Sequence, residues 1–192
     1  MANEKRDVII ITDGDQVAQK AIEEVARNVG GRCISRSGGN PTPLTGEEIV
    51  EQIKLAKYDP VLVMFDDNGN GDQGDGERAI EIVANHPEIN LLGIVAVASN
   101  TPMVQGVAVD YCVNASGEIT HHLVDKDGNE HKGQPAHIYG DTVDILSEIE
   151  APIIVGIGDI GKMQGADHVL HGAPITTKAV EMILERNGYN VD

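Results

Sequence analysis

The chain has 192 residues, of which 41% are hydrophobic and only 3% are aromatic, so its core must consist mainly of aliphatic side chains. Its 14 Lys and Arg residues are outnumbered by 31 Asp and Glu residues, which gives a formal net charge of −17. This charge would repel a nucleic-acid backbone or an anionic lipid surface. Composition therefore disfavours nucleic-acid binding and direct binding to lipid, and it favours cations or a basic protein surface as partners.

The length suits one domain, and we expect a single α/β domain over residues 1–192 because no linker-like stretch divides the chain. Cys33 and Cys112 lie far apart and form no metal-binding or redox motif, which is typical of a reducing compartment. The beginning of the chain, MANEKRDVIII, lacks a signal-peptide pattern, and the longest apolar runs are far shorter than the ~20 residues of a membrane span. We therefore expect a protein of cytoplasmic origin without a spanning segment.

Short β-branched runs alternate with helical patterns in the first half of the chain. The runs lack polar alternation, which is typical of parallel strands buried on both faces; they lie at residues 7–12, 32–35, 60–65 and 89–98. Helical spacing occupies residues 15–28, 45–57 and 77–85, and Thr45 with Glu48 has the form of a capping box. The alternation predicts a three-layer, mainly parallel, doubly wound (Rossmann-like) α/β sheet. Its expected central strands are Val8–Thr12, Val61–Phe65, Leu91–Ala96 and Ile153–Gly156.

The middle of the chain has a different pattern. From about residue 107 to 137, short strand-like runs are joined by turn sequences, of which Asp127-Gly128 is the clearest. This pattern predicts a β-rich insertion that forms an antiparallel edge of the sheet. The elements expected after it are a helix, a last parallel strand and a closing amphipathic helix, at residues 141–149, 152–158 and 174–189.

Three of the predicted strands are followed by carboxylates. Asp13 and Asp15 follow the first strand, Asp66 and Asp67 follow the third, and Asp159 follows the last. Ligands of open parallel sheets bind outside the carboxyl ends of the strands, so we expect these five side chains to form one acidic rim. Crowding should raise the pKa of at least one of them, and their oxygens suit Mg²⁺ or Ca²⁺. The alternative is structural: Asp15 caps the first helix, while Asp66 and Asp67 begin a turn.

The octapeptide GIGDIGKM at residues 156–163 is one residue short of a phosphate-binding P-loop. Met163 stands where the loop needs a Ser or Thr hydroxyl for Mg²⁺, and glycines follow too soon for the helix that holds the phosphate. Both departures disfavour nucleotide binding. The alternative that remains is a site for a smaller anion, formed by Gly156, Gly158, Gly161 and Lys162.

The carboxylates also leave an enzymatic alternative open. A metal-dependent, Toprim-like enzyme acting on phosphate esters or nucleotides would use carboxylates at strand ends, although here the D-x-D motif follows the first strand rather than a later one. Ser99 and Thr142 have no evident base, so no catalytic residue is assigned. His168 and His171 could share a metal on one helical turn, but hydrogen-bonded structural histidines are the favoured interpretation.

Longer stretches are more specific than any single motif. They are IITDGDQVAQKAIEEVARNVGGRCIS, SGGNPTPLTGEEIVEQI, YDPVLVMFDD, LLGIVAVASNT and PIIVGIGDIGKM with HGAPITTKAVEMILERNGY. Together they closely resemble the soluble form of the stage V sporulation protein AE family of spore-forming Gram-positive bacteria. The resemblance covers nearly the whole chain, except the loop at residues 69–76 and a middle segment at about residues 102–137.

The resemblance implies a role in the SpoVA system, which moves dipicolinic acid with its calcium into the forespore and out again during germination. It further implies a non-enzymatic accessory protein, peripheral at the spore inner membrane and docked on a membrane subunit of the system. The family offers no catalytic residues. We expect the membrane subunits as partners, with self-association left open, and Mg²⁺ or Ca²⁺ as the only cofactor candidates.

Overall fold

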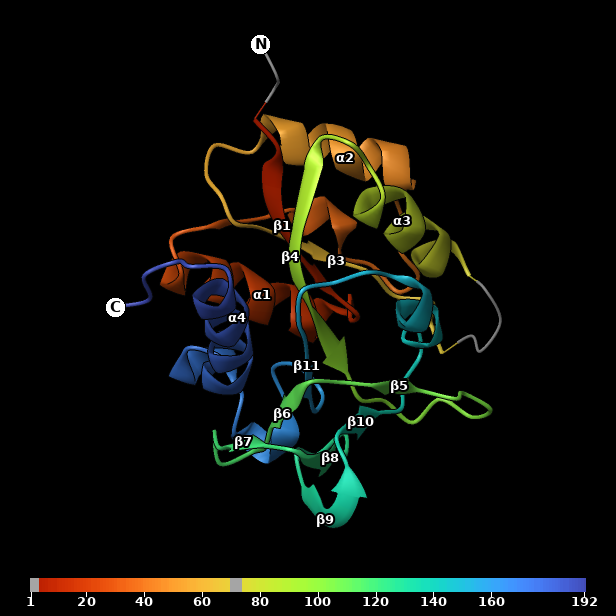
Figure 1. Cartoon of the computed structure of the whole chain (residues 1–192), viewed down its shortest axis with the longest axis vertical. Coiled ribbons are helices and arrows are strands. Elements are labelled where there is room, and N and C mark those ends of the chain that lie inside the picture. The colour runs from red at the N-terminus through yellow and green to blue at the C-terminus, as the bar shows by residue number, and fades with distance from the viewer. Residues whose placement is uncertain (1–3, 70–73) are drawn as a thin grey trace.

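The computed structural model describes residues 4–69 and 74–192 of the chain. In that part a mainly parallel, seven-stranded sheet lies between helices, with the strand order β2-β3-β1-β4-β11-β6-β7 (Figure 1). The strands are β1 (Arg6–Ile11), β2 (Arg32–Cys33), β3 (Val61–Met64), β4 (Ile89–Val97), β6 (Tyr111–Val113), β7 (Ile119–Thr120) and β11 (Ile154–Ile157). The predicted Rossmann-like α/β class is confirmed.

The central strands are apolar on both sides because both faces of the sheet are covered. Ile9 and Ile11 of β1 belong to the core on one face, while Val8 and Ile10 belong to the core on the other. Strand β1 pairs in parallel with β3 and with β4, and β4 pairs in parallel with β11. The first and third strands are therefore neighbours, which places their carboxyl ends side by side.

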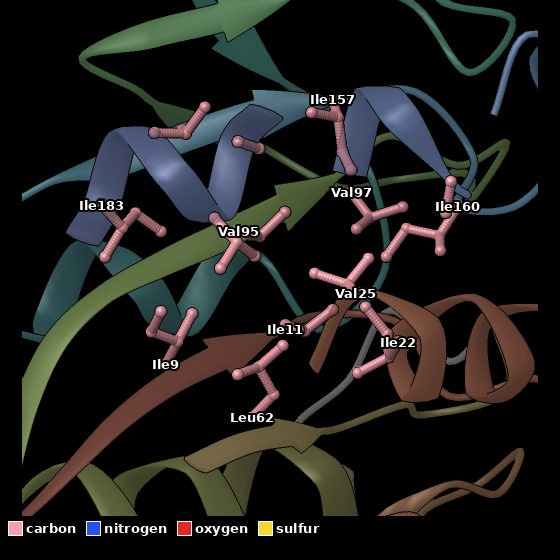
Figure 2. Close-up of a cluster of buried hydrophobic side chains, with 14 of the residues drawn as sticks. Ile9, Ile11, Ile22, Val25, Leu62, Val95, Val97, Ile157, Ile160 and Ile183 are labelled. Atoms are coloured by element: carbon pink, nitrogen blue, oxygen red, sulfur yellow. The ribbon is translucent and has the colours of Figure 1, made fainter. Parts of the chain in front are cut away.

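Two pairs of helices make the outer layers. Helices α1 (Gln16–Asn28) and α4 (Pro174–Arg186) cover the face that carries Ile9 and Ile11, as Figures 1 and 2 show. Helices α2 (Gly46–Leu55) and α3 (Asp75–Ala84) cover the opposite face. None of the helices in the described part of the chain combines the length and the apolar character that crossing a membrane requires.

Local sequence signals explain where two of these helices begin. The side chain of Asp15 accepts a hydrogen bond from the Ala18 N–H at 2.8 Å, so it caps α1 as the structural interpretation predicts. Thr45 and Glu48 form the predicted capping box at the start of α2. Helix α3 begins at Asp75, two residues before the expected start, and the loop before it lies partly outside the described residues.

The insertion contributes small strands beyond the carboxyl ends of the central strands (Figure 1). Strands β5 (Val107–Ala108) and β10 (His137–Ile138) form one antiparallel pair, and β8 (His122–Val124) and β9 (Glu130–Pro135) form another. The predicted antiparallel edge is present where β7 pairs with β6. Strand β6 itself pairs in parallel with β11. The long-range pairing of β6 with β11 decides this orientation, and no local sequence pattern encodes it.

Two local predictions need correction. Residues 141–149 do not form an α-helix: only a 3₁₀ helix, Asp144–Glu148, is present. Thr142 has a φ of 61°, a left-handed conformation that a helix cannot contain, and the Asp144 carboxylate accepts hydrogen bonds from Gln105 and Gly106. The second strand ends at Cys33, because a 3₁₀ helix begins at Ser35.

Candidate functional site

The carboxyl ends of β1 and β11 bring three carboxylates together. Asp13, Asp15 and Asp159 each offer an oxygen within 4.8 Å of the others, the one such acidic, His or Cys group found among the described residues. Asp13 and Asp15 lie just beyond the end of β1, and Asp159 lies just beyond the end of β11, two strands away in the sheet. The predicted convergence of the first and last strand ends is therefore present.

Lys162 lies between two of these carboxylates. Its Nζ is 2.9 Å from Asp15 Oδ2 and 3.1 Å from Asp159 Oδ2. Burial disfavours the charged ammonium, but the two carboxylates outweigh it and raise the pKa of Lys162. Burial likewise acts to raise the pKa of Asp15, yet the Ala18 N–H and Lys162 bring it below its ordinary value. Asp13, Asp15, Asp159 and Lys162 form what we call the Lys162 cluster.

Asp13 connects this cluster to the next part of the rim. Its side chain is only 8% exposed, and Oδ1 accepts hydrogen bonds from the backbone N–H groups of Gly14 and Asp15. Burial, followed by the charges of Asp15, Asp159 and Asp66, raises the pKa of Asp13 well above its ordinary value. The expectation that crowding raises a pKa on this rim agrees with this shift.

Asp66 and Asp67 occupy the next strand end and have structural partners. Asp66 Oδ1 accepts a hydrogen bond of 2.8 Å from the Asn68 N–H, which forms the expected turn. Asp67 Oδ1 accepts one of 2.7 Å from the Gly76 N–H at the start of α3. Both residues are buried, and burial is the main cause that raises the pKa of each.

Asp141 lies beside Asp66 and has no counterpart among the predicted site residues. Its Oδ2 accepts a hydrogen bond of 2.7 Å from the Gly69 N–H, and its backbone N–H donates to Ser99 Oγ. The carboxyl groups of Asp66 and Asp141 are within hydrogen-bonding reach, and this contact adds to the effect of burial in raising the pKa of Asp66. Asp66, Asp67, Asp141 and Thr142 form what we call the Asp141 cluster.

The glycines of the P-loop-like segment serve close packing. A Cβ at Gly158 would lie 2.8 Å from the Gly128 backbone nitrogen, and one at Gly156 would lie 2.5 Å from Ile138. The Gly161 N–H, which an anion would need as a donor, instead donates to Asp167 at 2.8 Å. The small-anion site stays a prediction. Lys162, the one basic residue predicted for it, is paired with Asp15 and Asp159.

Asp167 is fully buried, and it is not among the predicted site residues. Its carboxylate accepts hydrogen bonds from Gly161 N–H, and from Ile175 N–H, Thr176 N–H and the Thr176 hydroxyl in the first turn of α4. A carboxylate at a helix N-terminus satisfies free N–H groups and interacts favourably with the helix dipole. Asp167 thereby joins the segment that carries Lys162 to α4.

His168 has a structural role, as the favoured interpretation holds. Its Nδ1 accepts a hydrogen bond of 3.1 Å from the Leu170 N–H at the start of a short 3₁₀ helix. The ring centroids of His168 and His171 are 6.2 Å apart.

The geometry of the P-loop-like segment predicts that ATP does not stabilise the protein. We expect millimolar ATP to leave the melting temperature of the protein unchanged, because Lys162 is paired with carboxylates and the Gly161 N–H is occupied. The measurement is a thermal-shift titration of the native chain with the Lys162→Ala variant as control. A rise of several degrees in the native protein that the variant lacks would show that this segment binds a nucleotide.

The acidic groups predict how stability depends on pH without divalent cations. Burial, and then the charges of Asp67 and Asp144, raise the pKa of Glu77 to about 7, with Glu81 contributing in the same direction. A carboxyl group with a raised pKa binds its proton more tightly in the folded state than in the unfolded state. Its contribution to folding stability is therefore complete at pH values below the pKa of the unfolded state. That contribution is lost as the pH rises through the pKa of the folded state. Asp13, Asp66 and Asp67 shift in the same direction.

We therefore expect the melting temperature in a chelator to fall as pH rises from about 5.5 to about 7.5. Glu77→Gln should flatten this dependence because it removes one of the groups that titrate in this window. Calorimetric scans at several pH values check both statements. A melting temperature that climbs over the same interval would mean that the buried carboxyls are not protonated in the folded state.

The sheet and its strand ends define a Rossmann-like α/β protein with an acidic rim at the carboxyl edge. The family model of SpoVAE, Stage V sporulation protein AE1, matches residues 7–187, so the chain belongs to this family and has a role in the SpoVA system of sporulation. The resemblance in the sequence is thus confirmed. No curated protein and no solved structure gives a significant match to the chain.

Proposed function

We propose that the chain is a non-enzymatic accessory protein of the SpoVA system and assists its movement of dipicolinic acid and calcium during sporulation and germination. The observation that carries this proposal is the family match across residues 7–187. Since the described helices are unsuited to crossing a membrane, the protein would act peripherally at the spore inner membrane, bound to a membrane subunit of the system.

Charge indicates what kind of surface the protein would dock on. The net charge of −17 opposes contact with bare anionic lipid and favours a basic loop of a membrane protein. A groove on the side of α3 offers a place for such a loop. None of the described residues that line this groove is basic, and its carboxylates come from Glu77, Glu81, Asp144 and Glu148.

A flotation experiment tests this docking. The chain should float with proteoliposomes that contain the SpoVA membrane subunits and should stay at the bottom with protein-free liposomes of the same anionic lipids. Glu148→Lys in the groove should weaken flotation, whereas Glu185→Lys on α4 should not. Equal flotation with both kinds of liposome, or with neither, would contradict docking on a membrane subunit.

We also propose that the acidic rim binds a divalent cation, with Ca²⁺ and Mg²⁺ as the candidates. The support is the crowding of buried Asp13 with half-buried Asp15 and Asp159, whose mutual repulsion a cation would relieve. A cation that binds only the folded state stabilises it by about 2.7 kcal/mol at a hundredfold excess over the dissociation constant. Millimolar Ca²⁺ should therefore raise the melting temperature, and an unchanged melting curve would refute cation binding.

One observation supports a second function, a metal-dependent enzyme acting on phosphate esters. Asp13, Asp15 and Asp159 at the strand ends could hold Mg²⁺, and Lys162 could face a phosphate. Hydrolysis of p-nitrophenyl phosphate with Mg²⁺ or Mn²⁺, lost in Asp13→Asn, would establish this alternative. No hydrolysis above that of the variant would reject it.

A further inference from the structure

A groove lies beside the Lys162 cluster, between helix α1 and the segment that follows β11. We call it the Lys20 groove, and the residues that line it include Val17, Lys20, Lys162, His168, Val169 and Leu170. Its volume is about 570 Å³, which is within the range of small-molecule sites. Val17 is 41% exposed and Leu170 is 85% exposed, and exposed apolar side chains that gather at a groove indicate a binding surface.

The charge of the Lys20 groove is opposite to that of the chain as a whole. None of the described residues that line it is acidic, although the chain has 31 Asp and Glu residues and only 14 Lys and Arg residues. Of its two lysines, Lys162 is paired with Asp15 and Asp159. Lys20 is exposed and forms no ion pair with any residue that the structure describes. An uncompensated ammonium group therefore lies next to apolar surface.

His168 adds a hydrogen-bond donor to the groove. Its Nδ1 accepts a hydrogen bond from the Leu170 N–H, so the proton of the neutral ring is on Nε2. Nε2 forms no hydrogen bond to another residue of the described chain, and it is free to donate to a ligand. An ammonium group and an imidazole N–H both form favourable hydrogen bonds with an anionic oxygen.

The backbone of the wall opposite α1 is held in an unusual conformation. Met163 and Gln164 have φ values of 49° and 55°, a left-handed backbone that is unfavourable for residues other than glycine. Such residues persist where their surroundings fix them, and they are concentrated at ligand-binding sites. The Asp167 carboxylate fixes this segment by accepting a hydrogen bond from the Gly161 N–H, and a Cβ at Gly161 would lie 2.8 Å from Val17 Cγ1. The groove is therefore formed before any ligand binds.

We propose that the Lys20 groove binds a small organic carboxylate, with its hydrocarbon part on the apolar side chains and its anionic group at Lys20 and His168. Since the net charge of −17 repels anions from most of the surface, a groove without carboxylates is the place where an anion is least opposed. The site differs from the small-anion site predicted from the glycines, because the Gly161 N–H donates to Asp167. It depends neither on cation binding by the rim nor on docking to a membrane subunit.

NMR titration of the ¹⁵N-labelled whole chain tests the inference with three probes of nearly the same shape and different charge. The probes are 2-naphthoate, which is an anion, 2-naphthamide, which is neutral, and 2-naphthamidine, which is a cation. Naphthoate should shift the amide signals of residues 163–171 and of the first two turns of α1. It should bind about fivefold more tightly than the amide and about tenfold or more above the amidine.

Variants at exposed positions separate the charged part of the site from its apolar part. Lys20→Glu should weaken naphthoate binding about tenfold and leave naphthamide binding unchanged. Lys57→Glu is the matched control, because it makes the same charge change beyond the end of α2, on the opposite face of the sheet, and it should alter naphthoate binding less than about twofold. Leu170→Ser should weaken the binding of both probes because it removes apolar surface.

Three outcomes would overturn the inference. Equal binding of the three probes would show an apolar surface without selectivity for anions, as a protein partner would use. Naphthoate binding that survives Lys20→Glu unchanged would show that the anion is held elsewhere. Signals of the groove that do not move at millimolar naphthoate would show that it is not a site for organic carboxylates.

Discussion

Replacing Asp167 with alanine is expected to destabilise the fold by about 3–5 kcal/mol, one of the two largest effects that we predict for a single residue. The carboxylate is fully buried and accepts hydrogen bonds from Gly161, Ile175 and Thr176. Alanine would leave these donors unsatisfied in the interior. It would also detach the segment that carries Lys162 from the first turn of α4.

Urea unfolding of native and variant chains measures this effect. Asp167→Asn is the matched control, because an amide oxygen can still accept some of the hydrogen bonds and the loss should be about half as large. A loss below about 1 kcal/mol for the alanine variant would mean that water replaces the carboxylate and that the interior at this point is accessible.

Replacing Asp67 with asparagine is expected to stabilise the protein in a chelator, by about 1–3 kcal/mol. The substitution removes a buried charge that forms no ion pair in the described parts of the chain, while an oxygen remains to accept from the Gly76 N–H. The new amide nitrogen would replace Oδ2, which has no hydrogen-bond partner among the described residues, and could donate to the Thr142 hydroxyl. An increase in stability is unusual for a change at a buried polar residue, so the sign alone is informative.

Asp15→Asn is the control for this prediction. Asp15 carries a compensated charge, because Lys162 lies 2.9 Å from it and the Ala18 N–H donates to it. The same substitution there should therefore lower stability, by about 1 kcal/mol. Thermal melts of both variants in a chelator check the pair. Destabilisation by Asp67→Asn would show that the buried carboxylate is compensated by an interaction other than those described here.

Local patterns in the sequence were sufficient to predict the central sheet. The run DVIIIT buries side chains on both faces of β1, and the apolar stripe of residues 15–28 packs against it, so the hydrophobic pattern determines both the type and the place of these elements. The predicted antiparallel pairing is present between β6 and β7, but the parallel pairing of β6 with β11 could not be predicted because it joins residues far apart in the chain. The expected helix at 141–149 failed for a local reason, the left-handed backbone of Thr142.

Only those residues of the candidate site that lie at the carboxyl ends of strands could be predicted. Asp13, Asp15 and Asp159 are found together because the ends of parallel strands meet at one edge of the sheet. Asp141 and Asp167 belong to segments outside regular strands, and contacts that only the folded chain makes bring them to the site. Lys162 was expected to neutralise an anion, but the structure places it between two carboxylates.

Cation binding by the acidic rim would connect the proposed function to the chemistry of the proposed transport process. The chain belongs to the SpoVAE family, and we have proposed that it assists a transport process that involves calcium. An acidic protein whose rim takes up Ca²⁺ would have less negative charge and a more rigid carboxyl edge when calcium is abundant. Docking on a basic partner loop would then depend on calcium through the same electrostatic attraction.

An anomalous difference map from crystals grown with MnCl₂, compared with crystals grown with CaCl₂, tests the central claim most directly, because it locates the ion itself. The expected result is a strong peak among the carboxylates of the acidic rim, which come from Asp13, Asp15, Asp66, Asp67 and Asp159. The absence of any peak at these carboxylates, in crystals grown with either cation, would contradict cation binding by the rim.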